Sequence, residues 1–556
     1  MNIETRILSS LEKVYLDQDP KPCTVPFTAL QNEAFAFQVA LRPDVKQRYT
    51  RIIVKVTAKS ELPIIVKQVQ YVPCLLPMQV DDGRYERTTP GLFPDPLKSA
   101  DKDDTYFVPT GRWSSFFVEV FPGMAKEGEY PITLSFSAEI KSAAGSETLH
   151  WEVNTSLTVI GTVLPKSQLR YTCWFHGDCI ADYYNVPVFS EEHWTYMDKQ
   201  IKLAADRGQN MILTPIHTPP LDTWVGGERT TIQLIDVSVV NEEYSFDFKN
   251  LDRWIDMCLA NGIEYFEMAH LFSQWGATAC PKIMATVDGE YKKIFGWENK
   301  ALSDEYKGYL TAMLPALTTY LDSKGLHDKV YFHISDEPHG EHLLQYQKLK
   351  EFVSSLLDGF IIMDALSDYS FYEKGVLDYP VVATTALDPF LEGNRPNQFW
   401  IYYCIGQNYR HVSNRFFSLP GYRTRILGLQ CYKENVFGFL HWGLNFYNSQ
   451  YSLRHLDPYK CTDADGAHPG GESYVIYPGE NGEPVESQRL VIFHEAIQDI
   501  QALRLLESLT SREYVLSLMD EDVTEKVTFF TYPTGEEYQL KLRYKVNQKI
   551  AELTKL

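Results

Sequence analysis

Two patterns of hydrophobic and polar residues divide this chain into two parts. Up to about residue 160, short apolar or alternating runs recur between turn signals, without helical spacing. Predicted strands cover residues 35–41, 51–57, 64–72, 113–121, 130–136 and 149–160. Residues 81–104 are rich in Asp, Gly and Pro, which predicts a long surface loop. Several short strands without helices are typical of a β-sandwich, so residues 1–160 are predicted to form one.

After a hinge at residues 161–168, apolar runs alternate with helical patterns. Predicted strands cover residues 170–176, 211–216, 265–272, 329–334, 360–365, 381–387, 399–404 and 436–442, with helices at 191–207, 251–260, 304–323 and 341–357. Eight strands with intervening helices predict a (β/α)₈, TIM-like barrel over residues 168–455. A doubly wound open sheet is the competing fold, but no GxGxxG motif or P-loop follows a strand.

The last part of the chain is predicted to be mostly helical. Residues 448–487 form a Gly- and Pro-rich excursion, and residues 536–554 carry heptad-like apolar spacing. Residues 456–556 are therefore expected to be a loop excursion followed by helices that pack on the barrel. The whole is an α/β chain with an N-terminal β-sandwich, a barrel and a helical C-terminal segment.

Composition and charge narrow the classes of partner. The formal net charge is −21 and no basic run is present, so a nucleic-acid partner and an anionic membrane surface are not expected. No apolar stretch is long enough to predict membrane insertion. The first residues lack the apolar core of a signal peptide, and the nine cysteines are scattered without a CxxC pair. A cytoplasmic location is the expectation.

Polar and aromatic side chains gather where the predicted barrel strands end. In a parallel barrel these ends share one face and carry the reactive groups. Indole rings beside amides, acids and histidines are typical of a sugar pocket, because rings cover the apolar sugar face and polar groups bind hydroxyls. The candidate substrate-binding residues are Trp174, His176, Asp178, His217, Asp222, His270, Trp275, Tyr402, Trp442 and Asn445.

The fourth strand of the predicted barrel ends in Asp336, Glu337 and Pro338. Two neighbouring carboxylates raise each other's pKa, so their burial is unfavourable unless it serves chemistry. The plainer interpretation is that Asp336 caps the following helix while Glu337 is solvated. The position at a barrel strand end favours a catalytic pair.

Other chemistries lack their sequence signals. No HExxH motif, Cys/His cluster or EF-hand loop is present, so neither a metal nor a cofactor is expected. No GxSxG elbow indicates a serine hydrolase.

The adjacency of the two acids bears on mechanism. Ordinary glycosidases place two acids on opposite sides of the scissile bond, several ångströms apart, which sequence neighbours do not easily do. Neighbouring acids suit a substrate that supplies its own nucleophile, the 2-acetamido oxygen of an N-acetylhexosamine. Glu337 would then be the general acid and base, and Asp336 would orient the acetamido N–H.

Several separated segments resemble glycoside hydrolase family 123, the β-N-acetylgalactosaminidases. They are residues 171–178 (YTCWFHGD), 217–222 (HTPPLD), 333–338 (HISDEP), 414–416 (NRF), 438–445 (GFLHWGLN), 477–479 (YPG) and 487–490 (SQRL). The resemblance implies a sandwich followed by a barrel and an exo-acting, retaining hydrolase of terminal β-linked GalNAc. It also implies substrate assistance by an Asp-Glu pair, which corresponds to Asp336 and Glu337. The implied partners are terminal β-GalNAc residues of oligosaccharides or glycosphingolipid glycans.

Three alternatives stay open on the sequence. A preference for β-GlcNAc is one, because the configuration at C4 leaves no mark on composition or spacing. A conventional two-carboxylate glycosidase is another, with the second acid on a different strand, for instance Asp178. A non-catalytic glycan-binding protein is the third, although binding alone gives no reason to hold two acids together.

Overall fold

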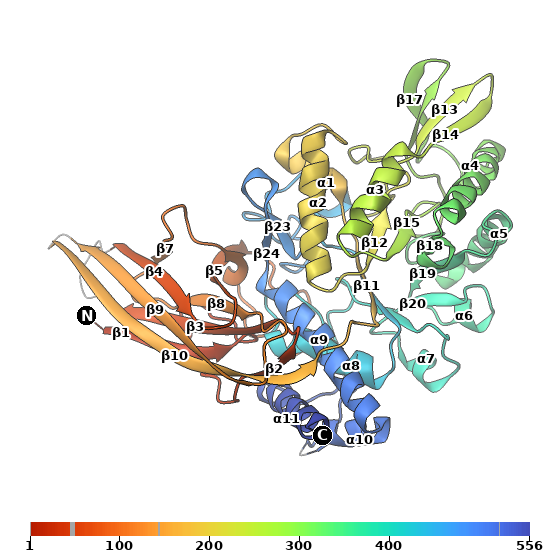
Figure 1. The fold of residues 1–556 in the computed structure, drawn as a ribbon. Coiled ribbons are helices and arrows are strands. Elements are labelled where there is room, and N and C mark those ends of the chain that lie inside the picture. The colour runs from red at the N-terminus through yellow and green to blue at the C-terminus, as the bar shows by residue number, and fades with distance from the viewer. Residues whose placement is uncertain (1, 45–50, 143–144, 522, 556) are drawn as a thin grey trace. The chain divides into compact units, whose positions relative to one another are not determined.

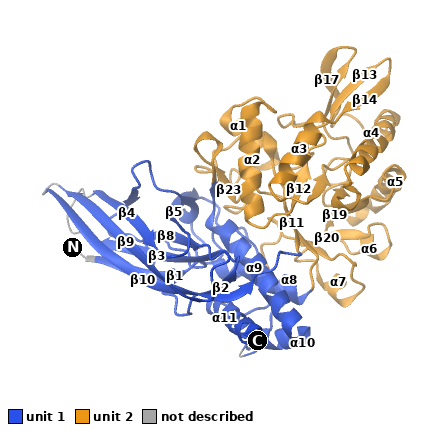
Figure 2. Cartoon of the chain, viewed as in Figure 1, with its two compact units in different colours: residues 1–168, 410–434, 485–556 blue, residues 169–409, 435–484 orange. Residues whose placement is uncertain are grey.

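The computed structural model describes residues 2–44, 51–142, 145–521 and 523–555, which form two compact units (Figures 1 and 2). Unit 1 comprises residues 1–168, 410–434 and 485–556, and unit 2 comprises residues 169–409 and 435–484. No helix in the described part of the chain has the length and apolar character needed to cross a lipid bilayer.

Unit 1 contains two five-stranded sheets. The strand order of the first is β1 (Asn2–Ser9), β3 (Phe35–Asp44), β8 (Ser114–Val120), β5 (Ile64–Cys74) and β6 (Gly91–Lys98). The order of the second is β2 (Thr28–Gln31), β10 (Gly145–Val163), β9 (Gly128–Ser142), β4 (Arg51–Lys59) and β7 (Tyr106–Val108). Alternate residues of both sheets, among them Phe37, Phe116 and Phe136, share one core, as in a sandwich.

The predicted surface loop at residues 81–104 is wrong in part, because Gly91–Lys98 forms strand β6. This strand lies at a sheet edge beside β5. Its two prolines, Pro94 and Pro96, lack an N–H for a ladder bond, and an edge strand tolerates that loss. The prolines of this segment therefore indicate an edge strand and not a loop.

Four helices complete unit 1: α8 (Gly421–Lys433), α9 (Gln488–Leu509), α10 (Arg512–Met519) and α11 (Glu537–Thr554). Their apolar side chains share a core with Leu30 and Ile160 from the strands and with Leu164, which follows β10. Helices α8 and α9 approach closely at Gly428, where a Cβ atom would lie 2.2 Å from the Ala496 carbonyl oxygen. The sequence predicts that the helices of residues 456–556 pack on the barrel. Their apolar faces instead share one core with the N-terminal strands, so the two units differ from the predicted domains.

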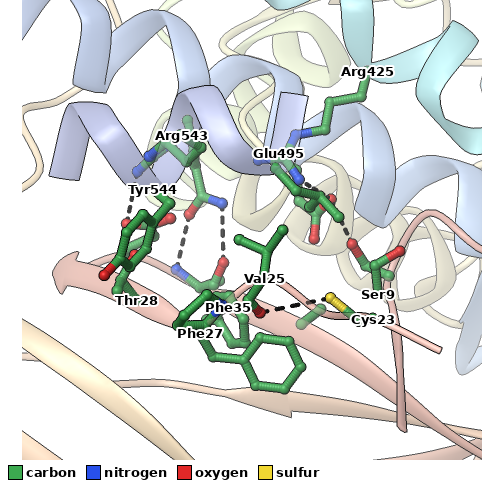
Figure 3. A pocket seen from close by; sticks show the side chains of 17 residues that line it. Ser9, Cys23, Val25, Phe27, Thr28, Phe35, Arg425, Glu495, Arg543 and Tyr544 are labelled. Atoms are coloured by element: carbon green, nitrogen blue, oxygen red, sulfur yellow. Dashed lines mark hydrogen bonds and ion pairs between the residues drawn. The ribbon is translucent and has the colours of Figure 1, made fainter. Parts of the chain in front are cut away.

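Unit 1 also encloses a cavity walled by N-terminal strands and C-terminal helices, which Figure 3 shows from close by. Three buried acids face it or lie behind it, and two arginines bind them. Arg425 donates to both carboxylate oxygens of Asp499, at 2.7 and 2.9 Å, and to Glu495 at 3.2 Å. Arg543 lies 2.9 Å from Asp499 and 2.7 Å from Glu33. Every acid of this cluster therefore has a cationic partner.

Unit 2 is built on a closed barrel of eight parallel strands. In order they are β11 (Arg170–Cys173), β12 (Met211–Thr214), β15 (Tyr265–Met268), β18 (Val330–Phe332), β19 (Ile361–Leu366), β20 (Tyr379–Ala383), β21 (Trp400–Tyr402) and β22 (Gly438–His441). Each strand overlaps a predicted one, although β20 begins before the predicted range of 381–387 and ends inside it. Strand β22 pairs with β11, which closes the sheet and excludes the doubly wound alternative. Gly438 is required there, because a Cβ atom would lie 2.3 Å from the Trp400 ring.

Helices connect most of these strands. They are α1 (Gly177–Tyr184), α2 (Glu191–Asp206), α3 (Lys249–Ala260), α4 (Asp304–Ser323), α5 (Leu343–Ser354), α6 (Ser370–Glu373) and α7 (Asp388–Glu392). The sequence did not predict the small sheet of β13 (Asp236–Val240), β14 (Glu243–Asp247), β16 (Ile283–Val287) and β17 (Glu290–Phe295). Its strands are inserted after β12 and β15 (Figure 1).

Candidate active site

A cavity of about 680 Å³ lies at the carboxyl ends of the barrel strands. Its lining residues belong to the strands or to the loops that follow them, as expected for a parallel barrel. The lining consists of Trp174, His176, Leu221, Asp222, Gln274, Trp275, Asp336, Glu337, Ala365, Tyr402, Cys404, Ile405, Leu440, Trp442, Phe446 and His468. Among these residues there are three acids and no lysine or arginine.

The local backbone explains how both neighbouring acids line one cavity. Consecutive residues of a regular strand point to opposite faces. Strand β18 ends at Phe332, and Glu337 adopts the left-handed conformation with φ of 44°. The Asp336 carbonyl accepts a hydrogen bond from Trp275 N at 3.1 Å, which fixes the chain at this bend. The turn after the strand therefore brings both carboxyl groups to the same space.

No lysine or arginine that the structure describes in the cavity lining balances the charges of Asp336 and Glu337. Burial raises the pKa of Asp336 well above its ordinary value, and the neighbouring Glu337 raises it further. Glu337 Oε1 accepts a short hydrogen bond from the Tyr402 hydroxyl. Burial and the Glu337 charge also raise the pKa of Tyr402 well above the ordinary value, so this phenol stays a donor. Because two like charges lie together here, the pair retains a proton that an exposed pair would lose.

Three buried side chains support the segment that carries Asp336 and Glu337. They are Glu267, His333 and Asp364, and this hydrogen-bonded group is called the relay. His333 Nε2 lies 3.0 Å from Glu267 Oε2, and His333 Nδ1 lies 3.1 Å from Asp364 Oδ1. Burial opposes a charge on His333, but Asp364 and Glu267 outweigh it and raise its pKa to about 9. The charge of this imidazolium lowers the pKa of Asp336 against the effect of burial.

Asp364 and Glu267, the two ends of the relay, bind the residues just before Asp336 and a side chain of the cavity lining. Asp364 accepts backbone hydrogen bonds from Ile334 N at 3.0–3.1 Å and from Ser335 N at 3.4 Å. Glu267 accepts a hydrogen bond from Trp174 Nε1 at 2.9 Å. The relay thus fixes both an indole ring of the lining and the residues just before Asp336.

His176 lines the cavity as a neutral imidazole. Its Nε2–H donates to the Trp442 carbonyl at 2.8 Å, and its Nδ1 accepts from Arg229 at 3.0 Å. Burial and the Arg229 charge lower the pKa of His176 to about 3. Arg229 also binds both oxygens of Asp178 at 2.8 Å. Asp178 is therefore the partner of a buried arginine and does not line the cavity.

Six of the ten predicted binding residues line the cavity: Trp174, His176, Asp222, Trp275, Tyr402 and Trp442. The other four, Asp178, His217, His270 and Asn445, lie outside its lining. His217 Nε2 bonds the His270 carbonyl at 2.9 Å, and Asn445 Oδ1 accepts from His176 N at 2.8 Å. They are buried residues that hold the strand ends together, a role that sequence position alone does not separate from binding.

Other lining residues escaped prediction. Gln274 stands beside Trp275 at a strand end and shares its signal, whereas His468 comes from the irregular excursion and has none. Arg229 and His333 act behind the lining. The charge of His333 depends on Glu267 and Asp364, 66 and 31 residues away, so only the folded chain reveals it.

His270, His333 and Asp364 are the group, within the described residues, whose donor atoms lie within 4.8 Å of one another as metal ligands do. His333 already directs both ring nitrogens at carboxylates, and a protonated imidazole has no lone pair to give. His270 stacks on His333 with ring centroids 4.4 Å apart. The ring nitrogens of His333 are therefore engaged in ion pairs with Glu267 and Asp364.

Comparisons with known proteins agree with this geometry. The family model of the glycoside hydrolase 123 catalytic domain matches residues 174–506. A family 123 glycoside hydrolase from Clostridium perfringens has a similar structure, with a TM-score of 0.71 at 16% sequence identity, covering 99% of this chain and 98% of that chain. No curated protein matches this sequence.

Two further structures are much less similar. A β-glucuronidase from Parabacteroides merdae gives a TM-score of 0.28 at 9% identity, over 89% of this chain and 51% of that chain. An endo-β-1,4-glucanase from Xanthomonas axonopodis pv. citri gives 0.31 at 11% identity, over 54% and 90%. The family match spans the cavity, the acid pair and the relay, and the chain is a glycoside hydrolase that belongs to family 123.

Proposed function

We propose that this hydrolase is an exo-acting, retaining β-N-acetylgalactosaminidase that uses the 2-acetamido group of its substrate as the nucleophile. The observation that carries the proposal is the adjacency of Asp336 and Glu337 in one cavity, with Glu337 bound by Tyr402. Neighbours at one strand end are poorly placed to flank a glycosidic bond from opposite sides. We also assign the barrel to the (β/α)₈ class.

In the first step, the acetamido carbonyl oxygen forms a bond to C1 while the glycosidic C1–O bond breaks. Glu337 gives its proton to the departing oxygen. Asp336 accepts a hydrogen bond from the acetamido N–H and balances the positive charge that develops on the oxazolinium ring. Since a hydrogen bond donated to a carboxylate favours its charged form, substrate binding favours the shared proton on Glu337.

In the second step, Glu337 takes a proton from water as the water oxygen bonds to C1. The ring bond between C1 and the acetamido oxygen breaks, and the acetamide is restored. Two inversions at C1 give a product that keeps the β configuration. The Trp174 and Trp442 rings supply apolar walls for the sugar.

A two-carboxylate mechanism is the second candidate, because a third acid, Asp222, also lines the cavity. Its Oδ1 accepts from Tyr451 N at 3.2 Å, while its Oδ2 has no hydrogen-bond partner among the described residues. A nucleophilic Asp222 would leave Asp336 without a role, whereas the acetamido mechanism uses both neighbouring acids. The acetamido mechanism therefore remains the better proposal.

The proposed substrates are oligosaccharides or glycosphingolipid glycans that end in β-linked GalNAc. The Clostridium perfringens structure was described in connection with glycolipid glycan hydrolysis. Lining residues from strands around the barrel enclose the cavity, a shape that suits a terminal sugar.

The test is a paired kinetic comparison of aryl β-GalNAc and aryl β-GlcNAc, with the product anomer followed by NMR. We expect faster hydrolysis of the GalNAc substrate and initial release of the β anomer. A faster GlcNAc reaction would change the assigned specificity, and initial release of the α anomer would exclude the retaining mechanism.

A further inference from the structure

Three aromatic side chains gather at the mouth of the catalytic cavity. Trp224 is 57% exposed and Trp275 is 40% exposed, values unusual for indole rings. The Tyr451 ring lies between them, with centroids 6.2 Å from Trp224 and 5.8 Å from Trp275. Both contacts are edge-to-face, at 66° and 82°. These three residues are called the aromatic rim.

The rim is tied to the acids of the cavity. Trp224 N donates to the Tyr451 carbonyl at 3.0 Å, and Tyr451 N donates to Asp222 Oδ1 at 3.2 Å. Trp275 N donates to the Asp336 carbonyl at 3.1 Å. Loops from distant parts of the sequence therefore hold the rim in a fixed relation to the acid pair.

The backbone is strained where it presents these rings. Trp275 has φ of 54° and Tyr451 has φ of 59°, a left-handed conformation that bulky residues rarely adopt. Such strain persists only where the surrounding structure enforces it, and it clusters at functional sites. The hydrogen bonds from Tyr451 N and Trp275 N to Asp222 and Asp336 provide that enforcement.

The rim is continuous with the catalytic cavity, because Trp275 lines it together with Glu337. A general acid stands next to the oxygen that departs, so the group attached to that oxygen leaves on the side of Glu337. We propose that Trp224, Tyr451 and Trp275 form the binding site for the sugar that is linked to the terminal GalNAc and departs with that oxygen. This inference rests on the proposed function.

Polar atoms beside the rim favour a sugar over a lipid. Asp222 Oδ2 and Gln274 Oε1 are buried acceptors without a hydrogen-bond partner among the described residues, and both residues line the cavity. A sugar offers hydroxyl donors for such acceptors as well as a C–H face for a ring. Val225 follows Trp224 and Leu453 comes two residues after Tyr451 in the sequence, and both are exposed, so a lipid is the competing occupant.

The experiment compares two substrates with one terminal sugar. One is an oligosaccharide in which β-GalNAc is linked to galactose, and the other is β-GalNAc fluoride, whose leaving group is too small to reach the rim. In Trp224→Ala, we expect the kcat/KM ratio of oligosaccharide to fluoride to fall about tenfold, as for a truncated aromatic anchor. Tyr451→Ala is expected to shift the ratio in the same direction. Tyr291, on β17, is 63% exposed, and Tyr291→Ala is the matched control that leaves the ratio unchanged.

The outcomes separate this inference from the proposed function. If wild type hydrolyses the fluoride and both rim variants keep the wild-type ratio, the rim proposal is wrong and the function stands. If wild type hydrolyses neither substrate, the proposed function is wrong. Binding to Glu337→Gln, measured by calorimetry, gives a second readout, and Trp224→Ala in that background is expected to raise the Kd of the oligosaccharide about tenfold. Phosphatidylcholine vesicles that bind wild type but not Trp224→Ala, with no change in oligosaccharide affinity, would overturn the assignment to a sugar.

Discussion

Two acid clusters, one in each compact unit, differ in what balances their charge. In unit 1, Glu33, Glu495 and Asp499 are bound by Arg425 and Arg543. In unit 2, the cavity that holds Asp336 and Glu337 has no lysine or arginine among its described lining residues. The acids of unit 1 are buried and Asp336 and Glu337 are half-buried, and the two clusters differ most in their cationic partners.

Asp499 and Asp336 differ in the direction of their pKa shift, although burial still raises the pKa of Glu33 and raises that of Glu495 to about 7. Burial opposes the charge of Asp499, but Arg425 and Arg543 outweigh it and hold the pKa of this carboxyl below its ordinary value. For Asp336, burial and the Glu337 charge act together and raise the pKa. An acid that is ion-paired with arginine maintains structure. An acid without such a cation is suited to exchange protons with a substrate. Substitutions should therefore affect stability in unit 1 and activity in unit 2.

Loss of Glu337, the proposed general acid, should have the largest effect. Glu337→Gln is expected to lower kcat for aryl β-GalNAc by about 10²–10⁴-fold, because it removes proton transfer to the leaving oxygen. Asp336→Asn is expected to lower kcat by about 10²–10³-fold, because it weakens the charge that stabilises the oxazolinium ion. Steady-state kinetics measures both effects.

Stability provides the control for these two variants. Asp336→Asn removes a buried charge that no adjacent cation fully offsets, so its melting temperature at pH 8 should equal or exceed that of wild type. A large loss of activity accompanied by a lower melting temperature would instead mark Asp336 as a structural residue.

In unit 1 the expectation is reversed. Arg425→Met leaves Asp499 and Glu495 buried without their main partner, and about 3–5 kcal/mol of unfolding free energy should be lost. The kcat of the folded fraction should stay within about twofold of wild type. Urea unfolding and assays below the transition measure the two quantities. Lys541→Met is the matched control, because its ion pair with Glu537 is exposed and contributes little to stability.

The acid pair also sets the pH profile. A raised folded-state pKa of an acid means that the proton is held below that pKa and lost as the pH rises through it. Because the mechanism needs one shared proton, kcat/KM should fall on the alkaline side at a pH above the ordinary carboxyl range. Asp336→Asn removes one of the two interacting carboxyl groups, so the alkaline limb should move from its wild-type pH. An alkaline limb that stays in place would assign it to another group.

The sequence was most informative where local signals agree with the fold. All eight barrel strands and the position of the acid pair follow from apolar runs that end in polar residues. The bend at Glu337 was only hinted at by Pro338, because backbone φ depends on contacts such as that between Trp275 N and the Asp336 carbonyl.

Long-range partners account for most of what the sequence did not predict. Asp178 sits at a strand end like a binding residue, yet Arg229, 51 residues away, binds it outside the cavity lining. His468 lines the cavity from an irregular segment with no periodicity. The grouping of α9 and α11 with the N-terminal strands depends on which apolar faces meet, and periodicity alone shows only that such faces exist.

The most direct test of substrate assistance varies the nucleophile inside the substrate. Aryl β-GalNAc analogues with acetyl, fluoroacetyl, difluoroacetyl and trifluoroacetyl groups on the 2-amino nitrogen differ in the electron density of the carbonyl oxygen. If that oxygen attacks C1, log kcat/KM falls steeply and in order with fluorine content, and the plain β-galactoside is almost inert. If an enzyme carboxylate such as Asp222 attacks instead, the series stays nearly flat and the galactoside is hydrolysed at a comparable rate.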